Sequence, residues 1–196
     1  MGYSFYAYSK ARFLETDGPG KHHPNEVLHI LLEYEEDRFL LDGQLEGVYQ
    51  VTGEEKDFNM CFGNYNTWRT IMFKILDKIS LANSQTAWDD AGEDGIFHAM
   101  IHLCTYGVII GPVTSKKLAG DFKNYRSTIE ELVNNDQEVR EVIEGEIAEE
   151  REEYPQQPEM AMDQAVEEKR QYFMEYYDYF CELFTLSSND GFMRMS

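Results

Sequence analysis

Two histidines, His98 and His102, stand four residues apart in the segment His-Ala-Met-Ile-His. On an α-helix this spacing places both imidazoles on one face, where they can hold a metal ion together. The zinc-protease motif needs a glutamate directly after its first histidine, and this chain has Ala99 there. The spacing sets no third ligand, and a structural or solvent-exposed pair is the simpler interpretation. We therefore treat His98 and His102 as candidate metal ligands and assign them no more specific chemistry.

The other residue patterns do not indicate catalysis. Adjacent acidic residues such as Glu149-Glu150 point in different directions on a helix, which is typical of a charged surface rather than of acid–base chemistry. The nucleophile elbow, the Walker A motif and the glycine motif of dinucleotide-binding proteins do not occur. Cys61, Cys104 and Cys181 lack the spacing of zinc sites and redox dithiols. We therefore predict no catalytic residue and no cofactor, and we favour a protein without enzymatic activity.

Negative charge is concentrated in one part of the chain. The sequence has 37 acidic and 17 basic residues, a net charge of −20, and residues 130–168 hold 15 acidic and two basic residues. This segment is either a solvated helix and linker, or a surface that binds a basic partner or imitates a nucleic-acid backbone. The excess of acid argues against nonspecific nucleic-acid binding, which needs Lys and Arg. The candidate partner-binding residues are Glu141, Glu144, Glu146, Glu149, Glu150, Glu152 and Glu153.

The length and composition indicate one domain. We expect residues 1–196 to fold as a single domain, with an acidic helix or linker at about 134–160. No run of about 18 apolar residues occurs, so neither a transmembrane helix nor membrane contact is expected. The first ten residues lack the basic and apolar regions of a signal peptide. With three widely spaced cysteines, these features predict a cytoplasmic protein with reduced thiols.

Several segments have the pattern of β-strands. Residues 2–14 alternate apolar and polar side chains, and 47–51 and 58–62 are short β-prone runs bounded by glycine. Residues 192–195 can add a short edge strand. The apolar run at 27–32 is too dense for its periodicity to distinguish strand from helix.

Two helices are expected in the middle of the chain. Between 68 and 79, apolar residues recur at the spacing of a helix face, and Asn66 or Thr67 is the expected N-cap. A second helix carries apolar residues between 118 and 132 at spacings of four and three, with Thr114 or Ser115 as its expected cap.

Two further helices complete the predicted fold. Residues 138–153 can continue as a highly acidic, exposed helix, which prolines at 155 and 158 then interrupt. Residues 162–186 predict a long helix with a wide aromatic face. We therefore expect an α+β fold, in which a small antiparallel sheet from the N-terminal half is packed by three to four helices.

Some of these segments resemble a known pattern. Phe62-Gly-Asn-Tyr-Asn-Thr-Trp-Arg69 is followed by Gly111-Pro112, Ser115-Lys-Lys-Leu118 and Asp121-Phe122. They resemble the Gly-Ser-Tyr…Tyr-Asn-x-Trp-Arg, Ile-Gly-Pro, Ser-x-Lys-Leu and Asp-Phe signature of a set of uncharacterised bacterial and phage proteins. The chain departs from that set at 104–107, where an acidic pair is missing. The resemblance implies a bacterial or phage setting, but it implies no activity and no catalytic residues.

Three hypotheses about function follow. The first is an acidic, non-enzymatic protein that binds and neutralises a basic protein, as immunity or phage counter-defence proteins do. The second is a small-ligand- or metal-binding protein, or an unrecognised enzyme, whose site combines His98 and His102 with Asp94 and Cys104. The third is a structural or homodimeric interaction module. The acidic segment and the missing catalytic motifs favour the first.

Overall fold

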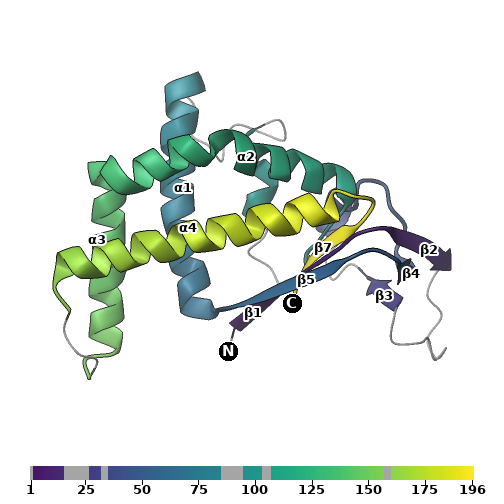
Figure 1. Ribbon diagram of the computed structural model, residues 1–196, viewed down its shortest axis with the longest axis horizontal. Helices are drawn as coiled ribbons and strands as arrows, with labels where there is room; N and C mark the ends of the chain where they lie inside the picture. The colour runs from purple at the N-terminus through teal and green to yellow at the C-terminus, as the bar shows by residue number, and fades with distance from the viewer. Residues whose placement is uncertain (1, 16–26, 32–34, 85–94, 103–106, 157–159) are drawn as a thin grey trace.

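The computed structural model describes residues 2–15, 27–31, 35–84, 95–102, 107–156 and 160–196. In these residues the chain forms α-helices and two antiparallel sheets, so the α+β class predicted from the sequence is confirmed (Figure 1). The α-helices are α1 (Phe62–Ser84), α2 (Pro112–Asn135), α3 (Gln137–Glu153) and α4 (Met162–Ser187). The 3₁₀ helices are η1 (Glu35–Leu41) and η3 (His98–His102).

The strands form a four-stranded sheet in the order β5-β1-β7-β6 and a three-stranded sheet in the order β2-β4-β3. They are β1 (Gly2–Tyr8), β2 (Ala11–Glu15), β3 (Val27–Ile30), β4 (Gly47–Val51), β5 (Glu55–Cys61), β6 (Ile109–Ile110) and β7 (Phe192–Met195). Because β1 pairs with β5 and β2 pairs with β4, the two sheets are halves of one long antiparallel ribbon. The ambiguous run at 27–32 contains the strand β3.

A sharp bend divides this ribbon into its two sheets. At the bend Ser9 donates its backbone N–H to the carbonyl of Glu54, and the N–H of Thr52 donates to the carbonyl of Lys10. Lys10 has a positive φ of 52°, which turns the chain from β1 into β2. These bonds keep the backbone polar groups of the bend paired although the regular ladder is interrupted.

The four helices form two antiparallel pairs that cross each other (Figure 1). Helices α2 and α4 lie side by side, and α4 also packs on β1 and β5. Helices α1 and α3 form the other pair, in which Thr67 contacts Glu146 and Lys74 contacts Glu138. As a result, the C-terminal end of α3 lies beside the N-terminal end of α1, and this end of the molecule lies away from the three-stranded sheet (Figure 1).

Aromatic side chains of α4 form the centre of the core. Phe173, Tyr177, Phe180 and Phe184 are all buried, at the spacing of a helix face. Two buried hydrogen bonds connect α4 to the neighbouring helices α1 and α2. Trp68 Nε1 donates to the carbonyl of Phe173 at 3.2 Å, and Tyr177 Oη donates to the carbonyl of Phe122 at 2.6 Å. The long aromatic C-terminal helix expected from the sequence is therefore the central element of the fold.

The predicted start of α1 was wrong by about one turn. The helix begins at Phe62, directly after β5, and Thr67 lies inside its second turn. Neither Asn66 nor Thr67 is the N-cap, because both lie inside α1, and the Thr67 hydroxyl donates to Glu146 at 2.7 Å.

The predicted start of α2 was also wrong. Its N-cap is Gly111 and Pro112 occupies the first turn, where proline is favoured because its missing N–H is not needed. Thr114 does not cap the helix; its N–H and hydroxyl donate to Asp42 at 2.8 and 2.7 Å. Residues 192–195 do form a strand, but β7 lies between β1 and β6 rather than at an edge.

Candidate functional site

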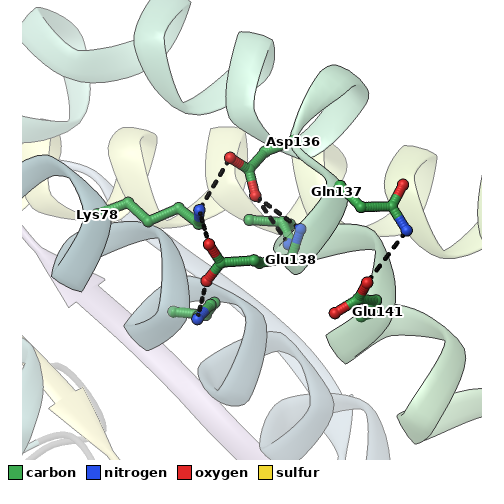
Figure 2. Close-up of polar contacts among 7 residues, drawn as sticks. Lys78, Asp136, Gln137, Glu138 and Glu141 are labelled. Carbon is green, nitrogen blue, oxygen red and sulfur yellow. Dashed lines mark hydrogen bonds and ion pairs between the residues drawn. The ribbon is translucent and has the colours of Figure 1, made fainter.

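The acidic helix α3 begins at a well-formed cap. Asp136 accepts hydrogen bonds at 3.0 Å from the backbone N–H groups of Glu138 and Val139, which satisfies two of the free donors at the helix start. Lys78 of α1 lies 3.0 Å from both Asp136 and Glu138, and Figure 2 shows its ammonium group between the two carboxylates. Lys74 bonds to Glu138 from the next turn of α1. The N-terminal end of α3 is thus tied to α1.

These contacts set the ionisation of Asp136. Partial burial alone raises the pKa of Asp136, but the hydrogen bonds from Lys78, Val139 and Glu138 outweigh it, and the pKa lies below the ordinary 3.8. A carboxylate whose folded pKa is lowered stabilises the fold above its unfolded pKa. That stability is lost as the pH falls through the folded pKa.

We expect Asp136→Ala to lower the free energy of unfolding at pH 7 by about 0.5–2 kcal/mol, the usual cost of removing an N-cap side chain. The difference from the wild type should shrink as the pH falls below about 3.8, because the unfolded chain binds a proton there and the folded carboxylate does so only at a lower pH. Urea unfolding at pH 7 and at pH 3 measures both effects. A loss of equal size at the two pH values would contradict the role of the charge.

Five of the seven predicted partner-binding glutamates make a hydrogen bond or an ion pair within the protein. Glu144 pairs with Arg140 at 2.7 Å, Glu146 accepts from Thr67 at 2.7 Å and Glu150 pairs with Lys169 at 2.7 Å. Glu141 accepts from Gln137 at 3.2 Å, as Figure 2 shows. The buried residues Val139, Ile143 and Ile147 recur every four positions and pack this helix onto the core. Much of the predicted acidic surface therefore has a structural role.

The C-terminal end of α3 carries three glutamates that are exposed to solvent. Glu149, Glu152 and Glu153 are exposed, and within the described residues neither Glu149 nor Glu152 makes a hydrogen bond or ion pair. Glu153 accepts a hydrogen bond from the adjacent Tyr154 hydroxyl, which raises the pKa of Tyr154. Free acidic charge is thus concentrated at the C-terminal end of the helix.

This position of the charge is unfavourable for the helix itself. The C-terminal end of an α-helix carries a partial negative charge, which attracts cations and repels carboxylates. Arg151 is the one basic residue in the last turn of α3, among Glu150, Glu152 and Glu153. Residues that weaken local structure without a compensating contact are typical of functional sites.

We therefore expect the variant Glu149→Gln/Glu152→Gln/Glu153→Gln to be more stable than the wild type. Removing three carboxylates from the negative end of α3 relieves their repulsion from the helix and from one another. The midpoint of thermal unfolding should rise by about 2–4 °C, which corresponds to about 1 kcal/mol for a chain of this size. Calorimetry at low ionic strength measures the shift, and a lower midpoint would contradict this account.

A groove of about 510 Å³ lies beside the same glutamates. Its walls come from the start of α1, the end of α3 and the first turns of α4, and they include acidic, basic and tyrosine side chains. The lining residues are Asn64, Ile147, Glu150, Arg151, Tyr154, Pro155, Met160, Ala165, Glu168, Lys169 and Tyr172. The sequence pattern did not indicate this groove. The abundance of tyrosine was the signal that the sequence offered, but the groove forms only through the packing of three helices.

His98 lies in a different and smaller cleft. This cleft of about 150 Å³ is formed by η1, η3 and one face of α2, with Lys117, Asp121 and Thr114 as its other polar residues. Asp121 accepts a hydrogen bond at 2.9 Å from the N–H of Phe97, whose positive φ of 54° is unusual for a residue with a side chain. Burial raises the pKa of Asp121, although Phe97 and Lys117 partly offset it. The cleft thus combines titratable groups of opposite charge.

The predicted pairing of His98 with His102 stays a prediction. These residues begin and end the 3₁₀ helix η3, and a 3₁₀ helix aligns residues three apart rather than four. The side chain of His102, together with Asp94 and Cys104, lies outside the described residues. Within the part of the chain that the structure describes, no three His, Cys, Asp or Glu residues gather in a way that suits a metal ion.

Comparisons with other proteins do not identify the chain. No protein-family model, no curated protein and no solved structure matches it. Among the described residues, no helix is both long enough and apolar enough to cross a membrane.

Proposed function

We propose that this protein binds a basic partner protein and neutralises it, and that the exposed glutamates at the end of α3 form the binding surface. The observation that carries the proposal is the position of Glu149, Glu152 and Glu153 at the negative end of a helix. Carboxylates at this end do not stabilise the helix, whereas they would attract a partner rich in Lys and Arg. This mode of action resembles that of an immunity or counter-defence protein.

The proposal implies binding that depends strongly on salt. Charges on opposite sides of an interface speed up association and exclude partners of the wrong charge. Because the screening length falls from about 8 Å at 0.15 M salt to about 3 Å at 1 M, exposed carboxylates lose most of their attraction at high salt. Glu144, Glu146 and Glu150, which are half-buried and bonded within the protein, should contribute less to binding than the three exposed glutamates at the end of α3.

A capture experiment with matched variants tests the proposal. The immobilised wild type, the variant E149Q/E152Q/E153Q and the control E54Q/E55Q/D57N are incubated with lysate of the native host, and mass spectrometry identifies retained proteins. The control removes the same charge from exposed positions at β5 and just before it, away from α3. We expect the wild type and the control to retain the same basic protein, which 1 M salt releases, and the α3 variant to lose it. Equal retention by all three proteins would refute the proposal.

A second candidate function is the binding of a small polar molecule in the His98 cleft. The observation that favours it is the convergence of His98, Lys117 and Asp121 around a cavity of about 150 Å³ with an apolar wall from Leu40 and Leu118. Ligand-observed NMR against a library of small carboxylic acids and amines tests it. Binding should be lost in Lys117→Ala and kept in Lys116→Ala, whose residue is exposed on the neighbouring position of α2. A library without a single such ligand would refute it.

A further inference from the structure

The groove at the end of α3 has an apolar floor and an aromatic rim. Ile147 is almost fully buried and Ala165 is half-buried, and both form part of the lining. Tyr154 and Tyr172 are 43% and 54% exposed, so both rings leave apolar area uncovered. Tyrosines of this kind are enriched where proteins bind one another, because they combine a large apolar ring with a polar tip.

The charges of the groove are not equally available. Lys169 lies 2.7 Å from Glu150 and is only 19% exposed, and Arg151 donates to the backbone carbonyl of Met160. Glu168 makes no hydrogen bond or ion pair with any described residue, and it stands one helical turn before Tyr172 on α4. Internal contacts thus occupy both cations of the groove, Lys169 in an ion pair and Arg151 at a backbone carbonyl, while the carboxylate of Glu168 is left beside an exposed aromatic ring.

We propose that this groove binds a lysine or arginine side chain of the basic partner protein. The cationic group lies at Glu168 and the face of Tyr172, and the aliphatic stem lies on Ile147 and Ala165. Lys and Arg side chains have such an apolar stem and a charged end, and their cations are attracted to tyrosine rings. The charge of the surroundings agrees, because Glu153 and the other exposed acids of α3 repel an anionic ligand. This inference rests on the proposed function and adds an anchor to it.

A titration with a defined probe tests the groove without the unidentified partner. Acetyl-Gly-Arg-Gly-amide and its lysine analogue are added to the ¹⁵N-labelled full chain, and amide shifts are followed by NMR. We expect saturable shifts in the first turns of α4. Glu168→Gln and Tyr172→Ala should each weaken binding about fivefold or more, as expected for the loss of a charge or cation–π contact. Glu175→Gln is the matched control, because it removes the same charge from an exposed position of α4 outside the groove.

Three results would overturn the inference. The first is an equal effect of Glu168→Gln and Glu175→Gln, which would indicate general charge attraction. The second is an unchanged affinity in Tyr172→Ala. The third is tighter binding of spermidine than of either peptide, with the same dependence on Glu168, which would make the groove a polyamine site. Both groove substitutions change side chains at the surface, and thermal unfolding of each variant checks that the fold is kept.

The capture experiment separates this inference from the proposed function. Loss of the partner in both E168Q/Y172A and E149Q/E152Q/E153Q supports the two proposals together. Loss in the α3 variant alone refutes the anchor and leaves the proposed function standing. Retention in both variants refutes the proposed function, and the peptide titration then decides whether the groove binds a cationic side chain of another protein.

Discussion

Replacing Phe180 with alanine is expected to lower the free energy of unfolding by about 3–5 kcal/mol, the range observed when a buried phenyl ring is removed. Phe180 is fully buried in the C-terminal half of α4. Its ring centroid lies 5.0 Å from that of Phe5, 5.1 Å from Phe58 and 4.6 Å from Trp68. Because these rings come from β1, β5 and α1, the resulting cavity would open where α4 joins the sheet and α1, and no single neighbour can fill it.

Urea unfolding of three variants measures this effect. Phe180→Leu keeps much of the volume and should lose clearly less than Phe180→Ala. Tyr172→Ala removes a ring from the same helix, but that ring is 54% exposed, so the change in stability should be small. If Phe180→Ala were no less stable than Tyr172→Ala, the aromatic cluster around α4 would not be the main source of stability.

The sequence allowed the long elements to be predicted because each buries one regular face. In α4 the residues Phe173, Tyr177, Phe180 and Phe184 follow the helical period, and all four are buried. The strand predicted at 47–51 is β4 with the same bounds, since it begins at Gly47 and β-prone residues follow. Periodicity reports burial well when local spacing alone decides which residues face the core.

The ends of helices and the order of strands could not be predicted in this way. Thr114 is a good cap by composition, but the carboxylate of Asp42, 72 residues earlier in the chain, accepts its N–H and hydroxyl. The position of β7 between β1 and β6 likewise depends on pairing across the whole chain, in which Phe192 lies opposite Tyr8. Long-range contacts of this kind leave no local pattern.

The candidate site shows the same division. The acidic segment was visible in composition, and the structure places its glutamates between 138 and 153 on one helix. Composition did not reveal that Thr67 and Lys169, from two other helices, engage Glu146 and Glu150. The groove lined by Tyr172 also needs three helices to meet. The packing of the helices is therefore needed to tell which of the predicted glutamates bond within the protein and which are exposed.

Replacing Gly191 with alanine is expected to lower the free energy of unfolding by about 3 kcal/mol or more. A Cβ atom at Gly191 would lie 1.7 Å from the carbonyl oxygen of Tyr8 and 2.9 Å from the Cα of Ser9. These are backbone atoms at the bend of the ribbon, and they cannot move as a flexible side chain does. The turn after α4 is also bonded to this bend, since Lys10 and Ala11 donate to its backbone at 2.8 Å.

The same substitution at Gly145 should raise the free energy of unfolding instead of lowering it. Gly145 lies in α3 with no atom within 4 Å of an added Cβ, so Gly145→Ala should raise stability by about 0.5–1 kcal/mol through helix propensity. Urea unfolding of the two variants compares one added methyl group at two positions. A similar loss of stability in both variants would mean that the turn after α4 is not in close contact with the bend. Opposite signs would show that contact between this turn and the bend joins the helical part of the fold to its two sheets.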